Sequence, residues 1–212
     1  MHPNPAFRDT ETAHNIRFAR ERGFGILAAA RDGPPPMSHV PFLLSEDGST
    51  ADLHLVRSNP ILRLLKDPIA VRIAVSGPDG YVSPDWYEIP DRVPTWNYVA
   101  VHLNGTLETR PQSELRALLD RQSTFYEARL LPKPPWTAEK MSDDALARMM
   151  RMMRMMRMIV PCRMRVQAID RTWKLKQNKP DEVRLRASDR IGSDGFGVDT
   201  QALSALMRDA LE

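Results

Sequence analysis

The sequence predicts a mainly β protein with peripheral helices (α+β), in which the strands form an antiparallel sheet or barrel. Short apolar or alternating segments follow one another closely in the first half of the chain, with hairpin-type turns between them. No strand–helix–strand alternation appears there, which argues against a parallel doubly wound sheet. The chain also holds 18 prolines among 212 residues, which is typical of turns and strand ends rather than of a helical bundle.

The strands are predicted from alternation, or from short apolar runs bounded by turn residues. Alternation is cleanest at 69–75, where Ile69, Val71, Ile73 and Val75 share one face. A strong turn, Ser76-Gly77-Pro78-Asp79-Gly80, follows it. In chain order, the predicted strands are 24–30, 37–44, 52–57, 69–75, 81–83, 97–108 and 162–169.

Helices are predicted from capping residues and from apolar side chains spaced three and four apart. The first begins at Asp9 or Thr10 and ends at Arg22, before Gly23. Two more are expected at 113–129 and 142–158, and a terminal helix at 199–211. The segment 179–198, rich in charge and glycine, is expected to be a loosely held connection.

Length and composition favour one globular domain. We predict a main domain at 1–180, with a connection and helix at 181–212 packed on it. Hydrophobic residues make up 42% and charged residues 27%, which excludes a wholly disordered chain. No apolar run reaches the ~18 residues of a membrane span. The N-terminus lacks the apolar core of a secretory signal, and Cys162 has no second cysteine to pair with. A cytoplasmic protein without membrane contact is the expectation.

The segment that follows the third predicted strand is a candidate phosphate site. Ser58 or Asn59 can cap a helix that has Pro60 at its first position and continues for about two turns. Arg57 precedes the cap and Arg63 lies one turn on. A helix N-terminus flanked by guanidinium groups suits phosphate. The alternative is an ordinary capped helix with surface arginines.

Two further segments could contact a ligand. Five of the 14 aromatic residues lie within residues 81–98, beside Ser, Thr and Asn, so they could wall in a flat heterocycle. They could equally plug a barrel end or form an interface. The polar run Trp173-Lys174-Leu175-Lys176-Gln177-Asn178-Lys179 could bind an anion or ring carbonyls, or could be a solvated strand end.

Residues 148–158 read RMMRMMRMMRM. On a helix, arginines three residues apart spiral slowly around the axis instead of forming one stripe. A nucleic-acid contact, a soft methionine-rich binding face and a tolerant helix with snorkelling arginines are all open interpretations.

No motif of a known catalytic class is present. The sequence has no P-loop, no GxGxxG, no HExxH and no GxSxG. Cys162 falls in a predicted strand and is expected to be buried rather than nucleophilic. His39, His54 and His102 lie on three different strands, and we predict no metal site. The catalytic residues therefore stay unknown.

Five segments, taken in order, resemble the PaiB family of FMN-binding proteins, which are described as negative transcriptional regulators. These are Ser38–Phe42, His54–Pro60, Gly77–Tyr87, Val93–His102 and Lys174–Asn178. The opening His2–Phe7 fits as well. The resemblance runs from the start of the chain to about residue 180, and its most specific elements are Val93–Tyr98 and Lys174–Asn178.

This resemblance implies a split β-barrel of the flavin-reductase and pyridoxamine-phosphate-oxidase type, usually a homodimer with FMN at the subunit interface. The phosphate-contacting segment of the family matches Arg57, Ser58, Asn59 and Arg63, and the strand with His39 would run beside the flavin. Thr95, Trp96, Asn97 and Tyr98 would come from the partner subunit. Lys176, Gln177 and Asn178 would lie near the ring or the phosphate.

The leading hypothesis is thus a homodimeric FMN-binding split-barrel protein with a regulatory role. Two alternatives remain: an FMN-dependent oxidoreductase with a nicotinamide donor, and a DNA-binding repressor without flavin chemistry. Whether the chain is an enzyme is left open, because FMN would supply any redox chemistry.

Overall fold

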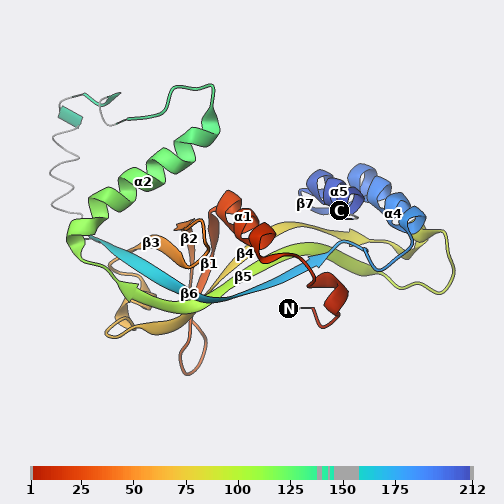
Figure 1. Cartoon of the computed structure of the whole chain (residues 1–212), viewed down its shortest axis with the longest axis horizontal. Coiled ribbons are helices and arrows are strands. Elements are labelled where there is room, and N and C mark those ends of the chain that lie inside the picture. Colours follow the sequence, from red (N-terminus) through yellow and green to blue (C-terminus); the bar gives the residue numbers. More distant parts are fainter. Residues whose placement is uncertain (1, 138–139, 143, 146–157, 211–212) are drawn as a thin grey trace. The chain divides into compact units, whose positions relative to one another are not determined.

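The computed structural model describes residues 2–137, 140–142, 144–145 and 158–210. The described strands form one antiparallel sheet in the order β1-β2-β3-β6-β5-β4-β7 (Figure 1). A further pairing of β1 with β4 closes the first six strands into a barrel. The bounds are β1 Phe24–Ala29, β2 Met37–Leu44, β3 Thr50–Val56, β4 Ile69–Val82, β5 Thr95–Thr109, β6 Ile159–Lys174 and β7 Gly197–Val198. The α-helices described are α1 Thr12–Arg22, α2 Leu115–Glu127, α4 Asp181–Asp194 and α5 Thr200–Asp209.

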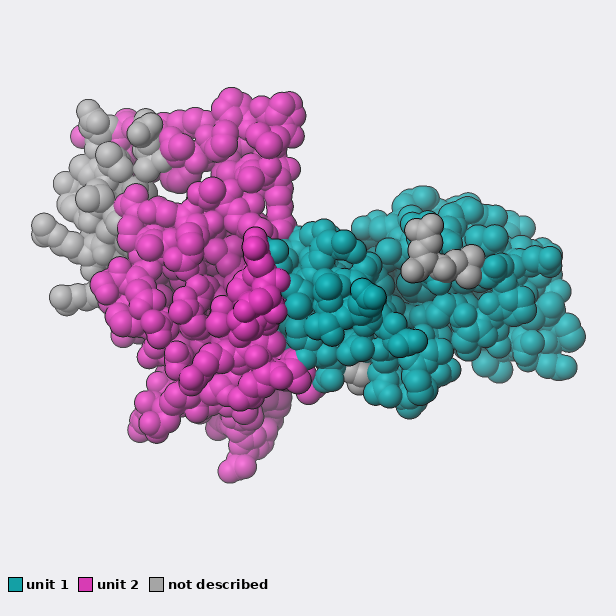
Figure 2. Space-filling model, viewed as in Figure 1, with its two compact units in different colours: residues 1–22, 74–103, 169–212 teal, residues 23–73, 104–168 magenta. Residues whose placement is uncertain are grey.

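The chain divides into two compact units, coloured separately in Figure 2. Unit 1 comprises residues 1–22, 74–103 and 169–212; unit 2 comprises residues 23–73 and 104–168. The strands β4, β5 and β6 each contribute one part to each unit.

Unit 2 holds the closed part of the barrel. Along β3 buried and half-buried residues alternate, so that Ala51, Leu53 and Leu55 face the interior. Phe42 and Met164 fill the same unit and are fully buried. Burying each such side chain stabilises the fold by about 1.5–3 kcal/mol. The barrel closes where the Ala30 amide donates to the Ala70 carbonyl, with an N···O distance of 3.0 Å.

Unit 1 packs helices on the extended ends of the long strands. Its core comprises Val82, Tyr87, Val99, Trp173, Leu175, Val183, Ala187, Ile191, Leu203 and Met207. A fully buried arginine, Arg184, donates from its guanidinium group to the carbonyls of Met207 and Arg208. Those carbonyls belong to the last turn of α5, where a cation is favourable.

The sequence predictions for β1, β2, β5, α1, α2 and α5 are confirmed within a few residues. The connection predicted at 179–198 was wrong, because α4 occupies Asp181–Asp194. Val183, Ala187 and Ile191 recur every four residues and form its buried face. The many charged residues between them hide that periodicity in the sequence.

The turn predicted at 76–80 was also wrong, since β4 continues through it to Val82. A Cβ at Gly77 would lie 2.8 Å from atoms of both Phe18 and Val99. This glycine therefore permits close packing within the strand and does not reverse the chain.

The strand predicted at 162–169 is longer at both ends and includes Pro161. Pro161 lies opposite His54 in the β3–β6 pairing, and its carbonyl accepts a hydrogen bond from the Arg110 amide. The helix predicted at 142–158 falls largely on residues 146–157, which lie outside the described residues, so the methionine–arginine tract has no structural account here.

Candidate functional site

The predicted phosphate segment follows β3 in unit 2. The Asn59 side chain shapes it: Oδ1 accepts from the Ile61 amide at 2.9 Å, and Nδ2 donates to Ser38 Oγ at 3.0 Å. The second bond ties the turn to β2. Arg57, Ser58 and Arg63 are all exposed around this turn. Asn59 is thus a positioning residue, and the exposed groups offer two guanidinium ions and a hydroxyl.

The helix predicted after Pro60 is shorter than expected. Pro60–Arg63 is a single 3-10 turn, and its cap is Asn59, one of the two residues predicted for that place. So short a segment does not sum the peptide dipoles of an α-helix. Asp67-Pro68 limits any extension, because the residue before a proline avoids the helical region. Recognition of a phosphate here would rest on side chains and not on a helix dipole.

His39 lies on the outward side of β2 in the same unit and is exposed. Its ring stacks on Phe24, with centroids 6.3 Å apart and an interplanar angle of 26°. Phe24 is 54% exposed and Met37 is 66% exposed. These side chains make an apolar outer wall on β1 and β2, of a kind that suits a flat ring.

The predicted residues 95–98 begin β5 in unit 1. Thr95 Oγ1 accepts from Lys174 Nζ at 2.6 Å, which joins the ends of β5 and β6. Trp96 is 40% exposed and donates from Nε1 to Asp79 Oδ1 at 3.2 Å. Tyr98 is half-buried. Asn97 is fully buried, and its Nδ2 contacts Met207 Sδ at 3.4 Å. Its Oδ1 has no hydrogen-bond partner in the part of the chain that the structure describes. Asn97 therefore does not reach the surface of unit 1.

Gln177 locks the turn that ends β6. Its Nε2 donates to the carbonyls of Trp173 at 2.6 Å and Ala6 at 3.1 Å, and its Oε1 accepts from the Leu175 amide at 3.0 Å. These bonds occupy the whole amide and hold the turn in which Lys176 takes a left-handed φ of 68°. Asn178 is exposed beside it. Within the predicted segment Lys176–Asn178, Gln177 therefore has a structural role, which is to hold this turn.

Lys176 is a buried cation in unit 1. Only 8% of it is exposed, and its Nζ lies 5.0 Å from the centre of the Tyr87 ring. Burial, together with the charges of Lys174 and Lys179, lowers the pKa of Lys176 to about 8. Burial raises the pKa of Tyr87 to about 12, and no described residue forms a hydrogen bond with its hydroxyl. An ammonium group so placed is ready to meet an anion or a carbonyl.

The structure thus gathers the predicted residues into two groups. His39, Arg57, Ser58, Asn59 and Arg63 lie in unit 2; Thr95, Trp96, Asn97, Tyr98, Lys176, Gln177 and Asn178 lie in unit 1.

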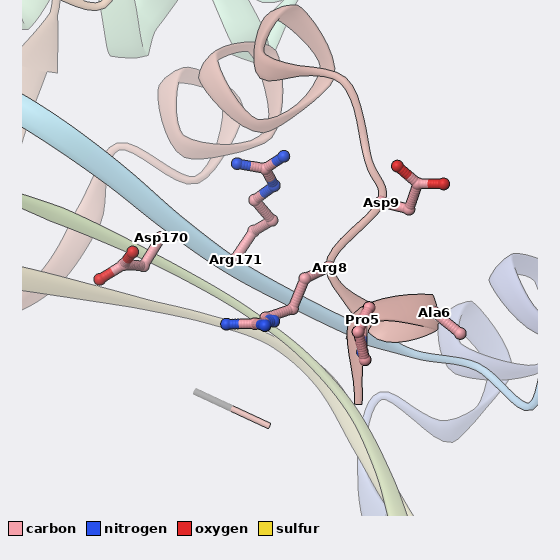
Figure 3. Close-up of a pocket in the computed structure, with 6 residues that line it drawn as sticks. All are labelled: Pro5, Ala6, Arg8, Asp9, Asp170 and Arg171. Atoms are coloured by element: carbon pink, nitrogen blue, oxygen red, sulfur yellow. The ribbon is translucent and has the colours of Figure 1, made fainter. Parts of the chain in front are cut away.

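Sequence reasoning missed a pocket at the N-terminal segment of unit 1. It has a volume of about 460 Å³ and is lined by Pro5, Ala6, Arg8, Asp9, Asp170 and Arg171 (Figure 3). Arg171 Nε is buried, and within the described ranges it has no hydrogen-bond partner. The lining carries charges of both signs, so charge alone selects no ligand. No sequence motif marks these residues, because residues 5–9 and 170–171 meet only in the fold.

A nucleophilic cysteine and a cluster of metal ligands are two further kinds of site, which depend on the burial and the grouping of side chains. Cys162 is 1% exposed, and burial raises the pKa of its thiol to about 12, so it is no nucleophile. Among the described residues, no three or more His, Cys, Asp or Glu side chains are grouped so that they could hold a metal ion. In that part of the chain no helix is long and apolar enough to cross a membrane.

Known proteins are similar to this chain in sequence and in fold. The family described as "Putative FMN-binding domain" matches residues 1–168. The chain is 26% identical over 208 residues to "Protease synthase and sporulation protein PAI 2" of Bacillus subtilis, covering 97% of this chain and 96% of that protein.

Among solved structures, an FAD and heme binding protein from Mycobacterium smegmatis superposes with a TM-score of 0.54 at 17% identity, over 91% of this chain and 82% of that one. The flavocytochrome Anf3 from Azotobacter vinelandii gives a TM-score of 0.51 at 11% identity, over 82% and 72% of the two chains. At these identities the likeness concerns the fold. The family match covers 168 of the 212 residues, so the chain belongs to this FMN-binding family and has the fold of the flavin-binding split barrels.

Proposed function

We propose that this chain binds FMN, with the phosphate held by Arg57, Ser58 and Arg63. The observation that carries the proposal is the exposed set of two guanidinium groups and a hydroxyl around a turn that Asn59 anchors to β2. Guanidinium groups bind phosphate oxygens in charge-assisted pairs, and a hydroxyl adds a further donor. The donor set therefore fits a phosphate dianion.

The flavin ring would lie along the outer wall formed by Phe24, Met37 and His39. Two of these side chains are more than half exposed, and the His39 ring already stacks on Phe24. A flat heterocycle over this wall would bury apolar surface that is otherwise in water. When bound, FMN supplies one- and two-electron redox chemistry, while these residues hold and orient it.

Replacing Arg57 tests the phosphate contact. Arg57→Ala is expected to weaken FMN binding by about 1.5–3 kcal/mol, because it removes one charge-assisted contact. Riboflavin lacks the phosphate, so its dissociation constant should not change. Flavin fluorescence titration measures both ligands. Arg31→Ala, at another exposed arginine of unit 2, is the matched control. Unchanged FMN affinity in Arg57→Ala would place the phosphate elsewhere.

We propose further that two copies complete the site, and that Trp96 and Lys176 of one subunit act with Arg57 of the other. Trp96, Phe196 and Tyr81 form an aromatic cluster in unit 1, in which Trp96 is 40% and Phe196 is 62% exposed. Exposed aromatic side chains are typical of interfaces. Asn97, being fully buried, would support this strand without touching the flavin.

Mixing two defective variants tests the shared site. Arg57→Ala and Trp96→Ala would each impair FMN binding alone, since each damages both sites of its own homodimer. After subunit exchange, about half of the dimers are mixed, and each mixed dimer regains one intact site, giving about 0.25 FMN per chain. Fluorescence titration measures the stoichiometry and sedimentation the dimer. No recovery in a mixture that does exchange would assign both residues to the same subunit's site.

A further inference from the structure

A second cavity lies in unit 2, between α2 and the outer face of β2 and β3. Its volume is about 400 Å³, and Pro41, His54, Leu119, Gln122, Tyr126 and Trp136 are among the residues that line it. We call it the α2 cavity. None of the residues used for the FMN proposal lines it.

Hydrogen bonds hold the walls of the α2 cavity in place. Tyr126 donates from its hydroxyl to the Gly23 carbonyl at 2.7 Å, which ties the ring to the start of the barrel. The Trp136 amide donates to Glu127 Oε2 at 2.7 Å, and Lys133 Nζ donates to the same oxygen at 2.6 Å. The loop after α2 is therefore folded back on the helix, with the Trp136 side chain 45% exposed at the cavity.

One polar pair is set into this cavity. His54 Nδ1 lies 3.0 Å from Gln122 Oε1, and an amide oxygen only accepts, so Nδ1 carries the proton and Nε2 is left as an acceptor. Gln122 is 5% exposed, and among the described residues its Nε2 has no hydrogen-bond partner. A buried donor without a partner is costly to a fold. Gln122 lines the cavity, and the terminal torsion of a glutamine is soft, so this donor can adjust its direction to a ligand there.

The charge of the cavity points to a neutral ligand. No Lys or Arg occurs among the described residues that line it. Burial lowers the pKa of His54 below its usual 6.5, so the imidazole is neutral at pH 7. The Glu127 carboxylate lines the cavity and would repel a carboxylate ligand, while Lys133 is already paired with Glu127 and Arg129 lies over the Phe125 and Tyr126 rings. A planar apolar ring would instead meet Tyr126 and Trp136.

We propose that the α2 cavity binds a neutral, planar aromatic molecule with a carboxamide or lactam edge. The carbonyl of that edge accepts a hydrogen bond from Gln122 Nε2, and its N–H donates to His54 Nε2. Tyr126 and Trp136 flank the ring. The two contacts match one amide edge, which carries an acceptor and a donor side by side.

Benzamide and methyl benzoate are the probes that test the pair of hydrogen bonds. They share the ring and the carbonyl, but only benzamide carries N–H donors. Benzoate, which carries a negative charge, serves as a third probe. We expect the wild-type chain to bind benzamide about tenfold more tightly than methyl benzoate, and benzoate more weakly still. Calorimetry gives the dissociation constants, and saturation-transfer NMR confirms contact with the ring.

Three variants assign the site. Gln122→Leu should weaken benzamide binding about tenfold, since it removes the carbonyl's donor. Trp136→Ala, at an exposed position that the fold tolerates, should weaken the binding of both probes. Gln167→Leu, at an exposed glutamine of β6, should change neither. Circular dichroism checks that the Gln122→Leu variant is folded. If that variant does not fold, the test rests on Trp136→Ala.

Equal affinity for benzamide and methyl benzoate would overturn the proposal, and so would no binding of either probe. The partner of Gln122 Nε2 would then be a buried water molecule. The lactam edge also occurs in flavin, so the titration is repeated with saturating FMN. Benzamide affinity unchanged by FMN supports a separate site, and displacement by FMN overturns it.

Discussion

Gly105→Ala is expected to destabilise the protein by about 3 kcal/mol or more, the upper range for overpacking a closed core. Gly105 lies in β5 within unit 2, where β5 pairs with β6. A Cβ at this position would stand 1.9 Å from the Arg165 carbonyl oxygen and 3.1 Å from the Val166 Cα. Both obstacles are backbone atoms, which cannot rotate away as the end of a side chain could. Relief would have to separate two paired strands of a closed barrel.

Urea unfolding measures the difference. Thr106→Ala is the matched control, because the neighbouring side chain is only half-buried and its loss leaves both backbones in place. We expect its effect to stay within about 1 kcal/mol. The same midpoint for the two variants would show that β5 and β6 can separate at this point without loss, and that the contact is not part of the closed barrel's stability.

Elements with a clear alternation or apolar stripe in the sequence form the strands and helices that those patterns predict. The strand at 97–108 is an alternating run, and the helices at 113–129 and 199–211 carry clear apolar stripes, so each side chain's preference and its tertiary place agree. The helix α4 was missed because Arg184 and Ser188, which look exposed by type, are buried. Their partners are on α5, where Ser188 Oγ donates to the Ser204 carbonyl at 2.7 Å, and such partners are invisible in a linear sequence.

The candidate site, like α4, was only partly predictable from the sequence. Family resemblance selected Lys176–Asn178 and Thr95–Tyr98, and the structure shows what holds them: Gln177 clamps the turn and Lys174 links the strand ends. A motif alone does not say which members touch a ligand and which build the cradle. Asn97 and Gln177 are of the second kind, since one is fully buried and the other has its amide filled. The α2 cavity left no motif at all, because His54 and Gln122 are 68 residues apart.

Lys176→Met is expected to make the isolated chain more stable at pH 7. The pKa of Lys176 is about 8 in the folded chain, against 10.5 when unfolded. Below pH 8 both states are protonated, and the folded state carries a buried ammonium whose Nζ lies against the Tyr87 ring. At about 1.4 kcal/mol for each pH unit, the cost of that charge is about 3 kcal/mol. Methionine has a similar length and no charge, so the gain is expected at about 1–3 kcal/mol once the contact with the ring is subtracted.

The pH dependence separates this effect from better packing. Between pH 8 and 10.5 the folded wild-type chain releases the Lys176 proton while the unfolded chain keeps it, so wild-type stability rises with pH in that window. The advantage of Lys176→Met must therefore shrink from pH 7 to pH 10, whereas a packing gain would persist. Urea unfolding of both chains at the two pH values, with exposed Lys66→Met as control, measures it. A variant less stable than wild type at pH 7 would mean that an anion already compensates the ammonium, so that this lysine is matched to a bound group and not left as a cost of the fold.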